Sequence, residues 1–168
     1  MKKIVVFFAV FVIIHQTKVF SQESNTMKTV EFENYSVSHP SDKTLIKGAG
    51  DGFTIYLNQR DNITMEINDL AGYMLDLDTY SEQFRYNYFQ KTNVTGFQSQ
   101  RISINNFPCH KFVASYDDGH GKIEFKVIVY IWVKNNWAYN LRFVAGPNNF
   151  DELKPIALKV MNSFRITQ

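Results

Sequence analysis

Histidine and cysteine are the side chains of this chain that are best suited to metal binding or nucleophilic catalysis. Three histidines, His39, His110 and His120, lie beyond an apolar N-terminal segment, and acidic residues such as Asp117 lie close to the last of them. A metal-dependent enzyme or a small hydrolase would need these groups to converge in space. Their spacing matches no known ligand pattern, so the sequence predicts no metal site and no cofactor. A metal-dependent enzyme or small hydrolase built on these residues is kept as the alternative function.

Cys109 is the only cysteine, so the chain can form no internal disulfide. Its neighbour His110 could act as a base, but adjacent residues of a strand point to opposite faces. We therefore expect Cys109 to be a small buried apolar residue. The sequence also has no nucleophile elbow, phosphate-binding loop or dinucleotide fingerprint. These observations predict a protein that is not an enzyme and has no catalytic residues.

The stretch 107–146 predicts three consecutive antiparallel strands, because turn residues at Asp117–Gly121 and Asn135–Asn136 separate runs of β-branched and aromatic residues. The middle run is apolar at alternate positions such as Ile131 and also at positions between them, such as Trp132. A sheet with one face in water would not have this pattern, so we expect a layer on each face of the sheet.

The expected registers of these strands bring three polar residues together. The second loop, taken as two residues long, sets Val129 opposite Arg142, and the first loop, taken as four residues long, sets His110 opposite Val129. His110 and Arg142 would then share a row on one face with Asn140 beside them, which predicts a ligand-binding site for a carboxylate or phosphate group. The alternative is structural: Arg142 would pair with an acid of the last helix, such as Glu152.

The rest of the chain predicts further strands and two helices. After Asp76, an apolar stripe at three- and four-residue intervals indicates an amphipathic helix, capped by Asp78 or Thr79. The residues of the stripe are Leu77, Tyr80, Phe84 and Tyr88. A second helix over 151–163 requires Pro155 in or near its first turn. Gly, Asp and Lys predict a loop at 41–52, and apolar runs predict strands at 35–38, 53–57, 63–67 and 93–105, the last paired with the central hairpin.

The order of these elements resembles the PsbP-like superfamily. The residues that carry the resemblance are a short strand that closes on a proline, Tyr35–Pro40, the motif Phe107-Pro-Cys-His before two long strands, and a terminal helix that ends in Val160-Met-Asn-Ser-Phe164. The resemblance extends over residues 22–168 and implies a small exported α/β/α domain of the PsbP and DcrB type, of the α+β class, with an antiparallel β-sheet sandwiched between helices. It implies no activity and no site residue. An NTF2-like cone is the alternative architecture.

Residues 1–21 have the pattern of a cleavable signal peptide. Lys2 and Lys3 precede an apolar run at Ile4–Ile14, and residues that a signal peptidase tolerates follow it. Eleven apolar residues are fewer than the roughly 20 that span a bilayer as a helix, so we expect export rather than membrane anchoring. Cleavage would leave residues 22–168 as a single periplasmic or extracellular domain without a membrane span.

Charge narrows the classes of partner. The signal peptide holds Lys2, Lys3 and Lys18 of the 18 basic residues and none of the 16 acidic ones, so the remaining domain is close to neutral. Such a domain does not have the basic stripe that nucleic acids or anionic lipids require. We expect an exported non-catalytic binding or assembly module of the bacterial cell envelope, with a protein partner contacted through loop 41–52 and the hairpin tip 117–121.

Overall fold

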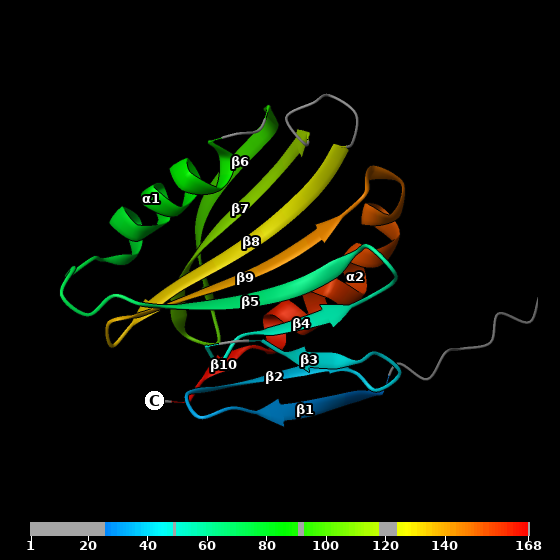
Figure 1. The fold of residues 1–168 in the computed structure, drawn as a ribbon, viewed down its shortest axis with the longest axis horizontal. Helices are drawn as coiled ribbons and strands as arrows, with labels where there is room; N and C mark the ends of the chain where they lie inside the picture. Colours follow the sequence, from blue (N-terminus) through cyan, green and yellow to red (C-terminus); the bar gives the residue numbers. More distant parts are fainter. Residues whose placement is uncertain (1–25, 49, 91–92, 118–123, 168) are drawn as a thin grey trace, which may run out of the picture.

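The computed structural model describes residues 26–48, 50–90, 93–117 and 124–167 (Figure 1). The described residues do not include the predicted signal peptide or residues 118–121 of the first hairpin loop, so the prediction for His120 cannot be compared with the structure. In the described part of the chain, no helix is long and apolar enough to span a membrane.

Two antiparallel sheets and two helices make up the described part of the chain. The helices are α1 (Leu77–Phe89) and α2 (Pro147–Ser163). The strands are β1 (Met27–Glu31), β2 (Tyr35–Pro40), β3 (Leu45–Lys47), β4 (Phe53–Tyr56), β5 (Asn62–Asp69), β6 (Val94–Ile104), β7 (Phe107–Asp117), β8 (Glu124–Lys134), β9 (Trp137–Ala145) and β10 (Arg165–Ile166). The main sheet has seven strands in the order β3-β4-β5-β9-β8-β7-β6, and the small sheet has three in the order β1-β2-β10.

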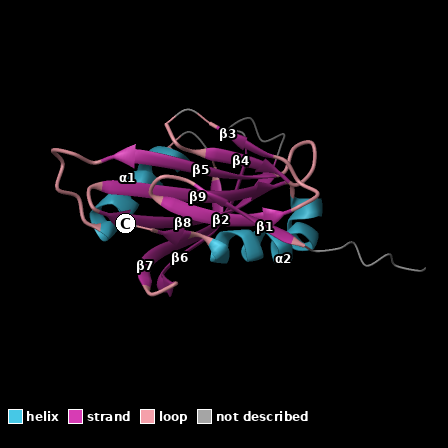
Figure 2. Cartoon of the chain, turned by 90° about the horizontal axis from the view of Figure 1, so that it is seen from below, coloured by secondary structure: helices cyan, strands magenta, loops and turns pink. Residues whose placement is uncertain are grey.

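The helices lie on opposite faces of the main sheet (Figure 2). Helix α1 packs on β7 and β8, whereas α2 packs on β8 and β9 and also on β2 of the small sheet. This arrangement confirms the predicted fold, an antiparallel sheet between helices in one α+β domain. The small sheet was not predicted, because β1 was not recognised as a strand and β10 is only two residues long, with no recognisable period.

Both faces of β8 are buried, as its sequence predicted. On the α2 side, Trp132 packs against Phe164 with ring centroids 4.7 Å apart, within a core that extends to Tyr35 of the small sheet. On the α1 side, Phe112 and Val129 belong to a second buried core. Burial of each large apolar side chain stabilises the fold by about 1.5–3 kcal/mol.

Two hairpin loops of the main sheet are Asn-Asn pairs, Asn105–Asn106 and Asn135–Asn136. All four residues have positive φ, between 51° and 68°, which is the type I′ conformation that suits the twist of antiparallel strands. The second pair confirms the predicted register of β8 and β9, with Val129 opposite Arg142. A two-residue loop therefore fixes the register directly.

The register of β7 and β8 differs from the prediction by two residues. His110 lies opposite Ile131 rather than Val129. Strand β7 continues to Asp117 and β8 begins at Glu124, so the connection is longer than the predicted loop. A shift of two residues keeps every side chain on its face, so the apolar pattern could not distinguish the two registers.

Three local predictions need correction. The cap of α1 is Asp76, whose Oδ1 accepts a hydrogen bond from the Thr79 N–H at 2.7 Å. Helix α2 begins earlier than predicted because Pro147 occupies its first turn, where a missing N–H costs nothing. Pro155 then lies inside the helix, on its exposed side. The predicted loop 41–52 contains the short edge strand β3.

Candidate functional site

The residues of the predicted site, His110, Asn140 and Arg142, all lie on the face of the main sheet that α1 covers. His110 and Asn140 both lie opposite Ile131 of β8, in one row. Arg142 lies opposite Val129, in the next row on the same face. Ile131 and Val129 belong to the core beneath α1. The structure therefore brings the three residues together on one face but not in a single row.

Polar contacts between α1 and this face form a strip that we call the α1 seam. It comprises Asp78, Tyr80, Ser81 and Tyr88 of α1, Glu66 and Asn68 of β5, Arg101 of β6, His110 of β7, and Asn140 and Arg142 of β9.

Asp78 lies at the first turn of α1 and bridges two strands of the sheet. Its Oδ1 lies 2.9 Å from His110 Nε2, and its Oδ2 accepts a hydrogen bond from Arg101 Nη1 at 2.8 Å. A carboxylate accepts but does not donate, so the Nε2 of His110 carries the proton and its Nδ1 is an acceptor when the ring is neutral. The bridge fastens the start of α1 to β6 and β7 by charge-assisted hydrogen bonds.

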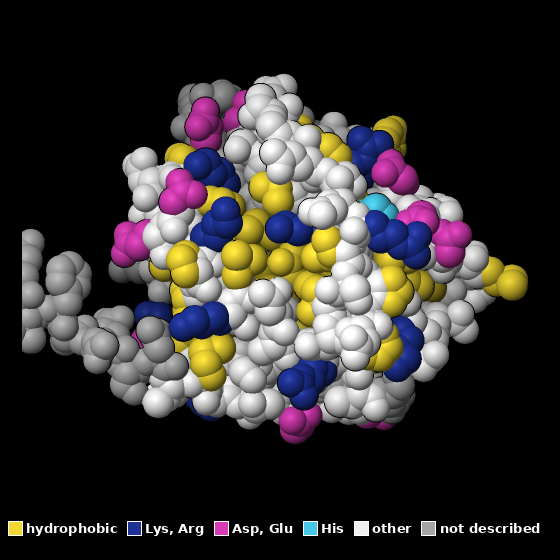
Figure 3. Space-filling model, turned by 180° about the vertical axis from the view of Figure 1, so that it is seen from behind, with side chains coloured by type: hydrophobic (Ala, Val, Ile, Leu, Met, Phe, Trp, Pro, Cys, Tyr) yellow, Lys and Arg dark blue, Asp and Glu magenta, His cyan; other side chains and the backbone are white. Residues whose placement is uncertain are grey.

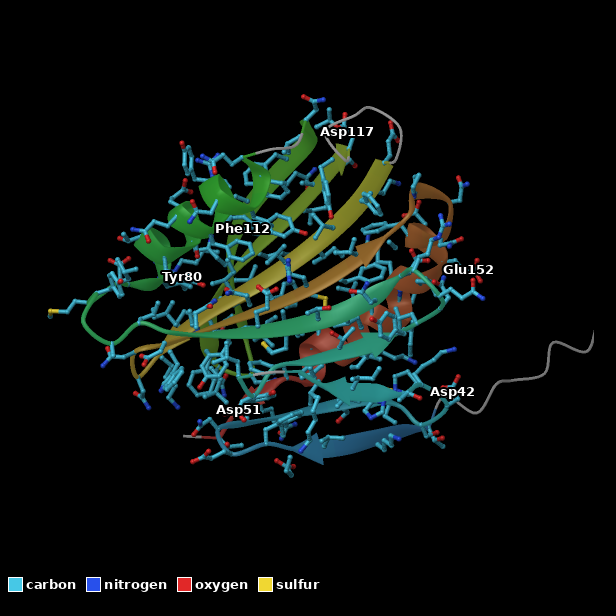
Figure 4. The ribbon with its side chains drawn as sticks, viewed as in Figure 1. Asp42, Asp51, Tyr80, Phe112, Asp117 and Glu152 are labelled. Carbon is cyan, nitrogen blue, oxygen red and sulfur yellow. The ribbon has the colours of Figure 1, made fainter. Side chains whose placement is uncertain are left out.

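Tyr80 holds the centre of the seam. Its hydroxyl accepts hydrogen bonds from Asn140 Nδ2 at 2.7 Å and from Asn68 Nδ2 at 2.9 Å. Figure 4 shows Tyr80 and Phe112 between α1 and the strands beneath it. Asn140 is completely buried, so its amide depends on partners inside the protein.

Arg142 holds the end of the seam near the C-terminus of α1. Its guanidinium forms an ion pair with Glu66 of the neighbouring strand and lies over the ring of Tyr88, 5.2 Å from the centroid. The Tyr88 hydroxyl lies 3.3 Å from that of Tyr116, and burial raises the pKa of Tyr116. The suggested pairing of Arg142 with Glu152 is wrong, because Glu152 lies on α2, beyond the opposite face of the sheet (Figure 4).

Several buried polar atoms of the seam have no hydrogen-bond partner among the described residues. They are Ser81 Oγ, His110 Nδ1, Asn140 Oδ1 and Arg142 Nε. Buried polar groups in proteins are nearly always paired, with protein, ordered water or a ligand. The set contains both donors and acceptors, so the seam offers hydrogen bonds of both kinds to a further polar group.

The remaining residues suited to chemistry lie apart from the seam. His39 is buried in β2 of the small sheet, and burial lowers its pKa. Cys109 is buried on the α2 side, where burial raises the pKa of its thiol to about 12, so the thiol is protonated at neutral pH. Residues 26–167, where described, contain no group of three or more His, Cys, Asp or Glu that could hold a metal ion. The structure thus does not bring His39 and His110 together.

Sequence reasoning missed the α1 residues of the seam. Asp78 was interpreted as a helix cap, and Tyr80 and Tyr88 were interpreted as parts of an apolar stripe. The available signal was that two of the stripe's members are tyrosines, whose hydroxyls need a polar partner when the ring is buried.

Solved structures share this architecture at very low sequence identity, whereas no family model and no curated protein sequence matches the chain. The PsbP protein CyanoP of Synechocystis sp. PCC 6803 superposes with a TM-score of 0.62 at 8% identity, over 87% of this chain and 95% of CyanoP. The chain has the PsbP-like fold. The fold that the resemblance implied is therefore confirmed.

Two further solved structures share this architecture. LpqN of Mycobacterium tuberculosis, which is involved in cell envelope biogenesis, superposes with a TM-score of 0.54 at 16% identity, over 86% of this chain and 93% of LpqN. The Ran-binding protein Mog1p of Saccharomyces cerevisiae gives 0.57 at 7% identity, over 86% of this chain and 97% of Mog1p. At such identities the likeness concerns the fold alone.

Proposed function

We propose that this protein is an exported, non-catalytic binding or assembly module of the bacterial cell envelope, in which the α1 seam receives a polar group of a protein partner. The observation that carries the proposal is the set of buried, unpaired polar atoms beneath α1, from Ser81, His110, Asn140 and Arg142. An unpaired buried polar group costs about 1–3 kcal/mol, so a group that completed these hydrogen bonds would be bound favourably.

The charges of the seam favour a neutral polar group. Arg142 is already paired with Glu66, and Arg101 is already paired with Asp78. His110 Nδ1 offers an acceptor, whereas Arg142 Nε offers a donor. We therefore favour a carboxamide or hydroxyl of the partner over the carboxylate or phosphate that the sequence suggested.

The alternative, a hydrolase or metal enzyme built on His39, His110, His120 and nearby acids, has less support. His39 and His110 lie in different sheets, and His110 is engaged by Asp78. Metal analysis of the purified protein, with an activity panel before and after chelation, distinguishes the two functions. Stoichiometric metal together with turnover that a chelator abolishes would establish the enzyme and overturn the binding proposal.

Substitution in the seam tests the binding role directly. We expect His110→Ala and Arg142→Ala to weaken the association with the partner by about tenfold each, since each removes a polar contact. Thermal stability should fall only slightly, because the carboxylates left without a partner, Asp78 and Glu66, are 57% and 48% exposed and can be hydrated. The measurement is affinity for a partner first isolated from the host envelope and then purified.

Lys154→Ala is the control for these variants, because it removes a charge from the exposed side of α2. It should leave both affinity and stability unchanged. If the two seam variants unfold several degrees earlier while affinity is retained, the seam is only structural.

A further inference from the structure

Strand β6 is an edge strand of the main sheet in the described part of the chain, and its hydrogen-bonding pattern can be assigned. The type I′ turn at Asn105–Asn106 makes Ile104 and Phe107 a hydrogen-bonded pair. Bonded and non-bonded pairs alternate along antiparallel strands, so the backbone N–H and C=O groups of Ser99, Arg101 and Ser103 point away from β7.

Two features of the sequence agree with this assignment. Pro108 lies opposite Ser103, in a non-bonded pair. Proline has no backbone N–H, and at this position no N–H is needed to bond to β6. Gly96 has a φ of +60° at a bulge between Thr95 and Gln98, which bends the strand and ends the regular edge there. We call the segment Ser99–Ser103 the β6 edge.

A hollow of about 370 Å³ lies on the α1 face between the C-terminal part of α1 and the start of β6, just beyond the bulge that ends the β6 edge. Its lining includes Phe89, Tyr86 and Phe97, with the last two 67% and 36% exposed. The guanidinium of Arg85 lies over the Phe97 ring, 5.4 Å from its centroid. Aromatic walls and a stacked cation suit an aromatic side chain.

A second hollow, of about 400 Å³, lies on the opposite face of the same strand. It is lined by Gln98, Ser99, Gln100, Lys111 and Val113. No described carboxylate forms an ion pair with Lys111, which distinguishes it from Arg101 on the other face. Figure 3 views the molecule from behind, where Lys and Arg side chains border a central apolar area and acidic side chains lie nearer the rim. This hollow suits an acidic side chain.

We propose that the β6 edge binds an extended segment of a partner protein as an additional strand. This deepens the proposed binding function and rests on it. Side chains of a strand alternate between faces, so one residue of the segment would place an aromatic side chain toward the hollow at Phe97, and its neighbour would place a carboxylate near Lys111. Backbone hydrogen bonds to Ser99, Arg101 and Ser103 supply affinity, and the two hollows supply selectivity.

A second copy of this chain is a poorer occupant. Strand β6 contains no acidic residue, so a paired β6 would bring no countercharge to Lys111. One antiparallel register would also set Arg101 opposite Arg101 of the other copy, which is destabilising.

The probe is a fluorescent nonapeptide, Thr-Glu-Val-Glu-Phe-Glu-Val-Glu-Thr, which reads the same in both directions and so presents one pattern to either strand orientation. We expect micromolar binding by fluorescence anisotropy, with no binding by a copy N-methylated at alternate residues. Lys111→Glu should abolish binding of the parent peptide. The same variant should bind a second peptide in which Lys replaces each Glu. Failure of the parent peptide to bind, or equal binding of the N-methylated copy, would overturn the proposal.

Proline substitution tests the edge itself. Ser99→Pro removes an N–H that points away from β7, so it should weaken peptide binding by about tenfold or more while preserving the thermal midpoint. Gln100→Pro removes a bond to β7 and should lower the midpoint markedly, which checks the assignment. The proposal is contradicted if Ser99→Pro binds the peptide as well as the unsubstituted protein does. It is also contradicted if sedimentation shows that the protein is a dimer and that Ser99→Pro is a monomer.

The same variant separates this inference from the proposed function. A purified envelope partner that binds Ser99→Pro and the unsubstituted protein equally, but loses affinity for Arg142→Ala, would overturn the strand-addition inference and leave the binding function intact. If no partner is found and the purified protein shows turnover that a chelator abolishes, the proposed binding function itself is overturned.

Discussion

At the residue scale, one oxygen atom connects α1 to two strands of the main sheet. The Tyr80 hydroxyl accepts hydrogen bonds from Asn140 and Asn68, while its ring belongs to the core beneath α1. Asn140 has no exposed surface, so water cannot replace the hydroxyl without entering the core. The contribution of Tyr80 is therefore separable into a packing part and a hydrogen-bonding part.

Tyr80→Phe isolates the hydrogen-bonding part. We expect the free energy of unfolding to fall by about 1–3 kcal/mol, because the ring stays while the buried Asn140 amide loses its acceptor. Urea unfolding measures the change. Tyr86→Phe is the matched control, since that residue is 67% exposed. Equal stability of the two variants would show that the Tyr80 hydroxyl does not hold the seam.

At the element scale, the N-terminus of α2 is held by a residue of the loop between β4 and β5. Asp61 accepts hydrogen bonds from the Gly146 N–H at 2.9 Å and from Asn149 Nδ2 at 2.8 Å, and also from Asn58 Nδ2. Burial alone would raise the pKa of Asp61, but hydrogen bonds from Asn149, Gly146 and Asn58 outweigh it and lower the pKa below its usual range. A carboxylate beside the N-terminus of a helix also interacts favourably with the helix dipole.

Asp61→Asn should lower the free energy of unfolding by about 1–3 kcal/mol at neutral pH. Because the pKa is lower in the folded protein than in the unfolded chain, the carboxylate stabilises the fold above about pH 4 and this stabilisation is lost as the pH falls through the folded pKa. Denaturant unfolding between neutral and acidic pH measures both effects, and the variant should show the weaker acid dependence. Asp151→Asn, with a side chain 79% exposed, is the control. Matching acid profiles for the two variants would contradict this role of Asp61.

Sequence reasoning predicted the elements better than it predicted their neighbours. The register of β8 and β9 could be predicted because Asn135–Asn136 permits one pairing, whereas the longer connection before β8 left two registers with equally apolar faces. The partner of Arg142 could not be predicted, because Glu66 lies 76 residues away and meets it only since β5 pairs with β9. Long-range strand order is the information that local patterns do not contain.

At the scale of the whole molecule, Phe164 joins the two sheets. Its ring lies between Trp132 and Tyr139 of the main sheet and Tyr35 of the small sheet, with centroid distances of 4.7, 5.8 and 5.4 Å. Its backbone C=O also accepts a hydrogen bond from Asn105 Nδ2 at 2.7 Å. One side chain after the end of α2 therefore contacts both parts of the larger core.

Phe164→Ala should destabilise the protein by about 3–5 kcal/mol, because it leaves a cavity between packed aromatic rings. This is a large share of the roughly 5–15 kcal/mol that stabilises a typical domain. Thermal and denaturant unfolding measure the loss. Tyr73→Ala, at a side chain that is 72% exposed, should change stability little. A small effect of Phe164→Ala would mean that the small sheet is not part of the cooperative unit.

The separation of the two cores by the main sheet has an evolutionary consequence. Trp132 and Phe164 pack on one face, and Tyr80, His110 and Arg142 lie on the other, so a substitution beneath α1 need not disturb the packing around α2. Descendants of such a chain can exchange the residues of one face while the opposite face continues to specify the fold. The same architecture occurs at identities of 7–16%, so very different sets of residues are compatible with it.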